Sequence, residues 1–113
     1  MDNVDKEEKM IRIGLYNGDK RKGIKIFNED FELLYFIPLS KIEYNIINII
    51  TDSKNYPCLY KDLLNEVYNT NIENDDEIKS YLPTLRVNIN RINKKLKPYA
   101  KIQNIYGRGY RLI

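Results

Sequence analysis

The residues of this sequence that could do chemistry are cations gathered towards its carboxyl end. Residues 79–113 contain nine Lys or Arg side chains and no Asp or Glu. Residues 1–36 carry seven basic against eight acidic side chains, and residues 37–78 carry three against eight. Because clustered cations release counterions from a phosphate backbone, this pattern indicates a polyanionic partner. The alternative is a solvated lysine-rich face that has no partner.

Catalytic and metal-binding chemistry has little to build on here. The sequence has no histidine, and Cys58 is its one cysteine, so it cannot assemble a Ser–His–Asp triad, a Cys–His pair or a Cys/His zinc site. The adjacent acids Asp75, Asp76 and Glu77 lie in a polar stretch, which favours a solvated loop over acid–base catalysis. We therefore predict that the protein is not an enzyme and needs no metal or cofactor. A single cysteine allows no intrachain disulfide, which fits a reducing cytoplasm.

An amphipathic helix is predicted over about 81–97. Its apolar residues follow a 3-4-3-4 spacing, which places them within about 60° of one another on a helical wheel. They are Leu82, Leu85, Ile89, Ile92 and Leu96. Ser80 is the expected N-cap, Pro83 falls in the first turn, and Pro98 ends the helix. The opposite side carries no acid and consists of Thr84, Val87, Asn88, Arg91, Lys94 and Lys95.

A β-hairpin is predicted over 101–113. Two β-prone runs flank Gly107-Arg108-Gly109, and glycine supplies the positive φ angles that tight turns need. A Gly-x-Gly turn alone is a weak signal. A basic helix followed directly by a basic-tipped hairpin is more specific, and it indicates a DNA recognition helix with its wing.

The two segments resemble the OmpR/PhoB-type winged-helix DNA-binding domain of bacterial response regulators. Residues 84–96 are similar to the family's recognition helix, T-V-D-V-H-I-x-R-L-R-x-K-L, and residues 104–112 to its wing, T-V-R-G-x-G-Y-R-F. Residues 39–44 resemble its L-T-x-x-E-F helix start. The resemblance extends from about Leu33 to Ile113. It implies an α+β fold, namely a winged helix-turn-helix with an amino-terminal antiparallel sheet, three helices and a C-terminal β-hairpin wing.

The resemblance also implies a function. It predicts a bacterial transcriptional regulator of a two-component system that binds double-stranded DNA with sequence preference, with helix 81–97 in the major groove and wing 101–113 at the minor groove. The implied contacts are Val87 and Arg91 for base edges, Thr84, Asn88, Lys94 and Lys95 for the DNA backbone, and Tyr106, Arg108 and Arg111 for the wing. Arg108 could equally be solvated at the hairpin tip. Arg86 and Asn93 depart from the family, which usually has an Asp or Asn and an Arg at these places, and so does Tyr106, where an Arg is common.

The elements that must position these residues begin with an antiparallel sheet. Three β-prone segments, 10–16, 24–27 and 31–38, are separated by turns, and their apolar face needs a helical layer. The first helix is expected from Ser40, which forms a capping box with Glu43, to about Thr51. The second is expected over 60–68.

The segment 69–79 is polar, acidic and without periodicity, and it is longer than the matching loop of the family. In relatives that loop contacts RNA polymerase, so 69–79 is either an altered polymerase contact or surface filler. We expect tandem or dimeric binding, because a single DNA-binding module buries only roughly 600–1,000 Å². The rival function is a winged helix repurposed as a protein–protein interaction module that docks an acidic partner.

The organisation of the chain is expected to be simple. Residues 1–9 are acidic and lack an apolar run, so we expect them to be disordered, with 10–113 forming one winged-helix domain. There is no signal peptide, and a mean hydropathy of −0.57 argues against a membrane protein, so a cytoplasmic location is expected. The family's receiver domain has no room here, which leaves both a stand-alone regulator and a fragment open.

Overall fold

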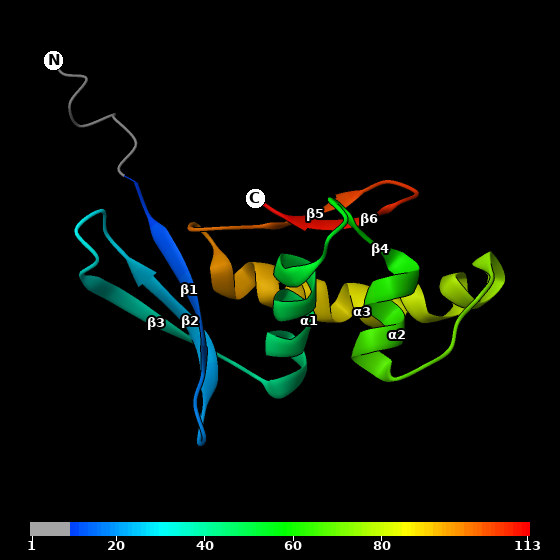
Figure 1. The fold of residues 1–113 in the computed structure, drawn as a ribbon, viewed down its shortest axis with the longest axis horizontal. Helices are drawn as coiled ribbons and strands as arrows, with labels where there is room; N and C mark the ends of the chain where they lie inside the picture. The colour runs from blue at the N-terminus through cyan, green and yellow to red at the C-terminus, as the bar shows by residue number, and fades with distance from the viewer. Residues whose placement is uncertain (1–9) are drawn as a thin grey trace, which may run out of the picture. The chain divides into compact units, whose positions relative to one another are not determined.

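The computed structural model describes residues 10–113, and the expectation for residues 1–9 lies outside this part. The chain divides into two compact units, one ending at Pro38 and the other running from Leu39 to Ile113 (Figure 1). The elements are β1 (Arg12–Asn17), β2 (Lys22–Phe27), β3 (Leu33–Leu39), α1 (Lys41–Asp52), β4 (Cys58–Leu59), α2 (Tyr60–Tyr68), α3 (Asp75–Leu96), β5 (Ile102–Ile105) and β6 (Gly109–Leu112). Within residues 10–113, no helix is long and apolar enough to cross a membrane.

The first unit is the predicted sheet, with strand order β1-β2-β3. β1 and β2 pair antiparallel, in a register that places Arg12 opposite Phe27. Gly23 allows the close approach of β3, because a Cβ atom on it would lie 2.3 Å from the carbonyl oxygen of Ile37. The turn between β2 and β3 is closed by the side chain of Asn28, whose Oδ1 accepts the backbone N–H of Asp30.

The second unit contains the three helices and a small sheet with strand order β4-β6-β5. α1 packs against α2, α3 and β6. The core of this unit consists of buried aliphatic side chains, each of which stabilises the fold by about 1.5–3 kcal/mol. The most deeply buried are Ile46, Ile47, Leu63, Leu64, Ile72, Leu85, Ile92, Leu96 and Ile102.

The predicted start of α1 is confirmed in detail. The Ser40 hydroxyl accepts the N–H of Glu43 at 3.2 Å, and the Ser40 N–H donates to Glu43 Oε1 at 2.8 Å. This reciprocal pair satisfies two N–H groups that a helix start would otherwise leave free. α2 likewise spans the predicted residues 60–68, although its N-cap, Leu59, makes no side-chain capping bond.

The predicted start of α3 is wrong, because the helix begins at Asp75 and absorbs half of the expected acidic loop. Asn74 is the N-cap, and its Oδ1 accepts the N–H of Glu77 at 3.0 Å. The first turn contains three acids, which the positive end of the helix dipole stabilises. Ser80 lies inside the helix and donates to the Glu77 carbonyl. Pro83 is therefore internal, where it removes a backbone hydrogen bond.

The predicted hairpin is confirmed as β5 and β6, and each of its two glycines has a structural reason. Gly107 has a φ of +74°, in the region that favours glycine. Gly109 lies against β4, where a Cβ atom would come within 1.8 Å of the Cys58 carbonyl oxygen. One glycine thus forms the turn, and the other lets the wing pair with the strand that precedes α2.

Candidate nucleic-acid interface

The exposed face of α3 carries most of the helix residues predicted to meet DNA. Thr84, Val87, Arg91 and Lys94 are all exposed, and Val87 has 50% of its surface accessible although it is apolar. Within residues 10–113, Arg91 and Lys94 form no hydrogen bond or ion pair. These side chains offer a hydroxyl, a methyl surface and two free cations to an external partner.

Asn88 does not lie on that face, contrary to the sequence-based expectation. It is only 9% exposed, and its Nδ2 donates to the Tyr68 hydroxyl at 3.2 Å and to the Thr84 carbonyl at 3.4 Å. The reason is geometric, because Asn88 lies about 40° from Ile92 on the helical wheel and α2 covers that flank. Its amide therefore ties α3 to α2.

Lys95 is already paired inside the protein. Its Nζ lies 2.6 Å from Oε1 of Glu43, the residue of the α1 capping box, which is 3% exposed. Burial acts to raise the pKa of Glu43, but the Lys95 ammonium and the N–H and hydroxyl of Ser40 outweigh it, and the net pKa is lowered. The pair connects the carboxyl-terminal half of α3 to the start of α1.

The wing residues divide into two groups. Tyr106 is 94% exposed at the tip and Arg108 is exposed beside it, so both are free to reach outwards. Arg111 is half-buried, its Nε donates to Gln103 Oε1 at 2.7 Å, and its guanidinium lies 5.3 Å from the centre of the Tyr56 ring. Within residues 10–113 the Arg108 side chain has no partner, whereas Arg111 stiffens the wing.

Asn93 fixes the wing to α3, a role that sequence reasoning missed. Its Oδ1 accepts the N–H of Ile102 at 2.7 Å, and its Nδ2 donates to the Ile102 carbonyl at 3.1 Å. Asn65 holds Ile72 in the same two-pronged way, at 2.7 and 3.2 Å. The only signal in the sequence was that Asn93 departs from the family pattern.

A polar groove lies between α3 and the wing, and it contains two further cations that were not assigned to the site. Its volume is about 480 Å³, and Arg86 from α3 and Lys101 from the start of the hairpin both line it. The buried Tyr110 lies at its side; burial raises the pKa of this phenol, while the nearby Arg86 guanidinium acts in the opposite direction.

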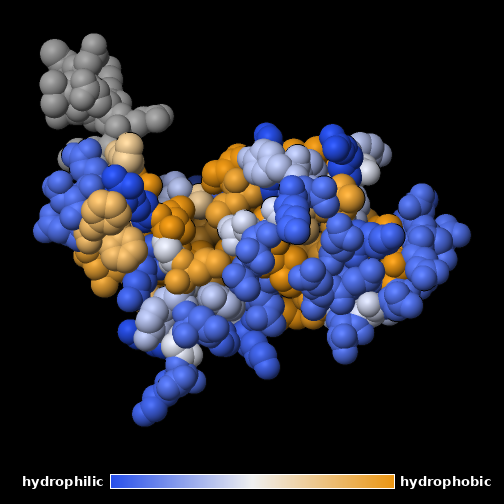
Figure 2. Space-filling view, viewed as in Figure 1, coloured by the Kyte–Doolittle hydropathy of each residue, from blue (hydrophilic) through white to orange (hydrophobic). Residues whose placement is uncertain are grey.

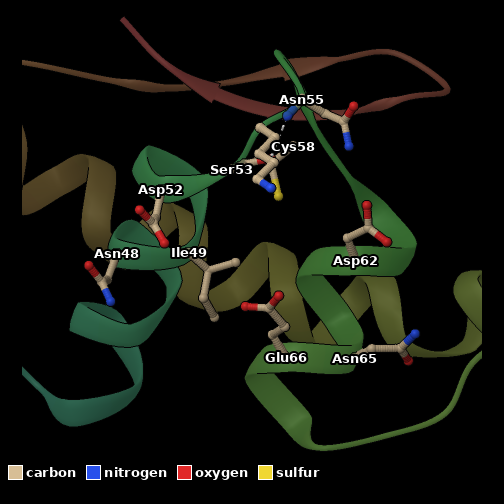
Figure 3. Close-up of a pocket in the computed structure, with 10 residues that line it drawn as sticks. Asn48, Ile49, Asp52, Ser53, Asn55, Cys58, Asp62, Asn65 and Glu66 are labelled. Carbon is tan, nitrogen blue, oxygen red and sulfur yellow. Dashed lines mark hydrogen bonds between the residues drawn. The ribbon is translucent and has the colours of Figure 1, made fainter.

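The cavity in Figure 3 has the opposite chemistry. It lies between α1 and α2, has a volume of about 410 Å³ and receives carboxylates from Asp52 of α1 and from Asp62 and Glu66 of α2. Burial raises the pKa of the Cys58 thiol at its edge, with the two α2 carboxylates acting in the same direction. No group of three or more His, Cys, Asp or Glu within residues 10–113 is arranged to hold a metal ion. An anionic ligand would be repelled here.

Charge is therefore segregated within the helical unit. Figure 2 shows hydrophilic side chains over most of the visible face of α2 and the amino end of α3, where Asp75, Asp76 and Glu77 are exposed. The free cations lie further along α3 and on the wing. A polyanion would meet the second half of the helix and avoid its acidic beginning.

The comparisons with known proteins agree with this geometry. The crystal structure of the DNA-binding domain of Bacillus subtilis CssR superposes with a TM-score of 0.54 at 20% identity, covering 88% of this chain and 100% of that one, which supports the winged-helix fold. No curated protein gives a significant sequence match. Residues 35–112 match the family described as transcriptional regulatory protein, C terminal. The chain therefore belongs to the C-terminal, DNA-binding domain family of transcriptional regulatory proteins, as its resemblance to OmpR/PhoB-type effector domains predicted.

Proposed function

We propose that this domain binds double-stranded DNA with sequence preference as a bacterial transcriptional regulator, with α3 in the major groove and the wing at the minor groove. The observation that carries the proposal is the acid-free exposed strip of α3, in which Arg91 and Lys94 have no partner within the described residues. Asn88 and Lys95 hold the flank of this strip against α2 and α1, and the opposite side of the helix is buried through its leucines and isoleucines. A rigid helix with free cations on one face suits insertion into a groove.

Base reading is assigned to Arg91 and Val87. A guanidinium can bridge O6 and N7 of guanine, a contact worth ~1–3 kcal/mol of discrimination. Val87, half exposed on the same face, offers a surface for a thymine methyl group. Thr84 and Lys94 flank this pair and would contact phosphates, which position the helix without reading sequence.

The support roles differ from those implied by the family pattern. Asn88 and Lys95 act by holding α3 against α2 and α1, because Asn88 Nδ2 donates to Tyr68 and Lys95 Nζ donates to Glu43. Arg111 acts in the same way on the wing. Arg108, with Tyr106 beside it, would reach the minor groove, where narrow A·T tracts concentrate negative potential.

Two further partners follow from the same arrangement. A second copy is proposed on DNA, in tandem or as a dimer, because one module of this size buries little surface. RNA polymerase is proposed as the partner of the segment 69–79. Two hydrogen bonds from the Asn65 side chain to the Ile72 backbone clamp its loop in place, and its exposed acids would keep DNA away.

Selection from a random duplex pool, followed by binding measurements at increasing salt, tests the proposal. With about five cations at phosphates and a slope of about −0.9 per phosphate, a fourfold rise in salt should weaken binding on the order of a hundredfold or more. The selected sites should contain two half-sites about one helical turn apart. Failure to bind any selected duplex, or binding that ignores salt, would favour the protein–protein interaction module.

A further inference from the structure

The groove between α3 and the wing contains cations that the function proposed above does not use. Resting on that proposed function, we propose that this groove seats one strand of the DNA backbone, with Arg86 and Lys101 contacting phosphates from its two walls. Arg86 and Lys101 thereby join the interface, and the DNA backbone passes between the helix and the wing.

The groove is longer than its first hollow. A second hollow of about 770 Å³ adjoins it and shares Asn90, Asn93 and Lys101 as lining residues. Together the two hollows follow α3 from Arg86 to Lys97, a length of about 16 Å at ~1.5 Å per residue. Duplex DNA places one phosphate per strand about every 3.4 Å of its axis, and the spacing along the winding strand is larger, so the groove is long enough for more than one phosphate.

The side chains that line the groove give it a positive charge, which attracts phosphate and repels a cationic ligand. Four cations line the two hollows and no Asp or Glu does; the cations are Arg86, Lys94, Lys97 and Lys101. None of the four forms an ion pair within residues 10–113.

The amides of the groove also present donors. Asn104 Oδ1 accepts the Tyr60 hydroxyl at 2.5 Å, and Gln103 Oε1 accepts the Arg111 Nε–H at 2.7 Å. Both acceptor oxygens are engaged inside the protein, and within residues 10–113 neither N–H₂ group donates a hydrogen bond. Side-chain amides are common donors to phosphate oxygens, so the neutral part of the lining matches the charged part.

The wall positions are fixed by contacts already described. Asn93 clamps the backbone of Ile102 to α3, which sets the distance between the helix and the first strand of the hairpin. Lys101 directly precedes that clamped residue, and its backbone pairs with Ile113. The two cationic walls are therefore joined directly by hydrogen bonds between α3 and the hairpin.

The test uses the duplex selected by the wild-type domain and the variants Arg86→Gln and Lys101→Gln. Each variant should weaken binding roughly tenfold on every sequence and reduce the salt slope by about one. Lys54→Gln is the matched control, because Lys54 lines the acidic cavity between α1 and α2. It should leave both quantities close to wild type. Urea unfolding of each variant confirms that the fold is intact.

Single uncharged methylphosphonates, placed at each backbone position of that duplex, locate the contact. At one or two adjacent positions the methylphosphonate should weaken DNA binding by the wild-type domain. At the same positions it should cause no further loss of affinity in Arg86→Gln. Two results together would overturn the inference while leaving the proposed function standing. They are an unchanged salt slope in both variants, and a methylphosphonate loss that adds to the loss of each variant at every backbone position. Altered preference at one base pair with an unchanged slope would also overturn it, because Arg86 would then read a base. A wild-type domain that binds no duplex would overturn both.

Discussion

Removing the side chain of Asn93 should detach the wing from α3. Lys101 and Ile113 exchange backbone hydrogen bonds, so the next residue, Ile102, turns its N–H and carbonyl away from β6, and Asn93 receives both. Asn93→Ala removes two hydrogen bonds worth about 0.5–1.5 kcal/mol each. Ile102 is 2% exposed, so leaving its N–H without a partner adds a desolvation cost. Position 93 is half-buried, and water that enters there in the variant offsets part of this cost.

We therefore expect Asn93→Ala to lower the free energy of unfolding by about 2 kcal/mol, a loss of roughly 8–16 °C in Tm for a domain of this size. Urea and thermal unfolding followed by circular dichroism measure it. Asn90→Ala is the matched control, three residues earlier on the same helix and exposed, and it should change stability by less than about 0.5 kcal/mol.

A DNA-binding cycle then separates positioning from simple destabilisation. If Asn93 holds the wing in place, Arg108→Ala should cost less affinity in the Asn93→Ala background than in the wild type, at a temperature where both proteins are folded. An Asn93→Ala protein as stable as the control, or one in which the Arg108 effect is unchanged, would refute the reasoning.

Two other predictions concern the cations of α3. Arg91→Ala should flatten preference at one base pair of the selected site, whereas Lys94→Ala should weaken all sequences alike and reduce the salt slope by about one; parallel losses on single-base variants would make Arg91 only a phosphate contact. Lys95→Met should lower stability at pH 7 by about 1–2 kcal/mol, less than for a fully buried pair because Lys95 is 42% exposed. Because the pKa of Glu43 is lowered in the fold, its contribution is present above the ordinary glutamate pKa and is lost as the pH falls through the folded value. Urea unfolding of the wild type and of Lys95→Met, measured from pH 7 to pH 3, should thus give free energies of unfolding that converge at acid pH. A difference that stays constant with pH would contradict the role of the Lys95–Glu43 pair.

The sequence by itself determined the features that depend on neighbours in the chain. The capping box of Ser40 and Glu43, the span of α2 and the glycine turn at Gly107 all involve residues a few positions apart, and each agrees with the structure. The buried stripe of α3 follows from its periodicity in the same way, and all five predicted apolar residues are buried.

The start of α3 shows where local signals compete. Ser80 followed by Pro83 resembles a helix start, and so does Asn74 followed by three acids. Asn74 is the N-cap in the fold, and the clamp of Asn65 on Ile72 holds the loop just before it. That clamp joins residues seven apart around a turn, so no helical or strand periodicity reveals it.

Only the tertiary structure decided which polar side chains are free to meet DNA. A helical wheel gives the direction of a side chain, but not the element that covers it. Tyr68 of α2 buries Asn88, Glu43 binds Lys95 from 52 residues away, and Gln103 engages Arg111 across the hairpin. Each of these cations and amides looked available in the sequence, and each is held by a partner that comes close only when the chain folds.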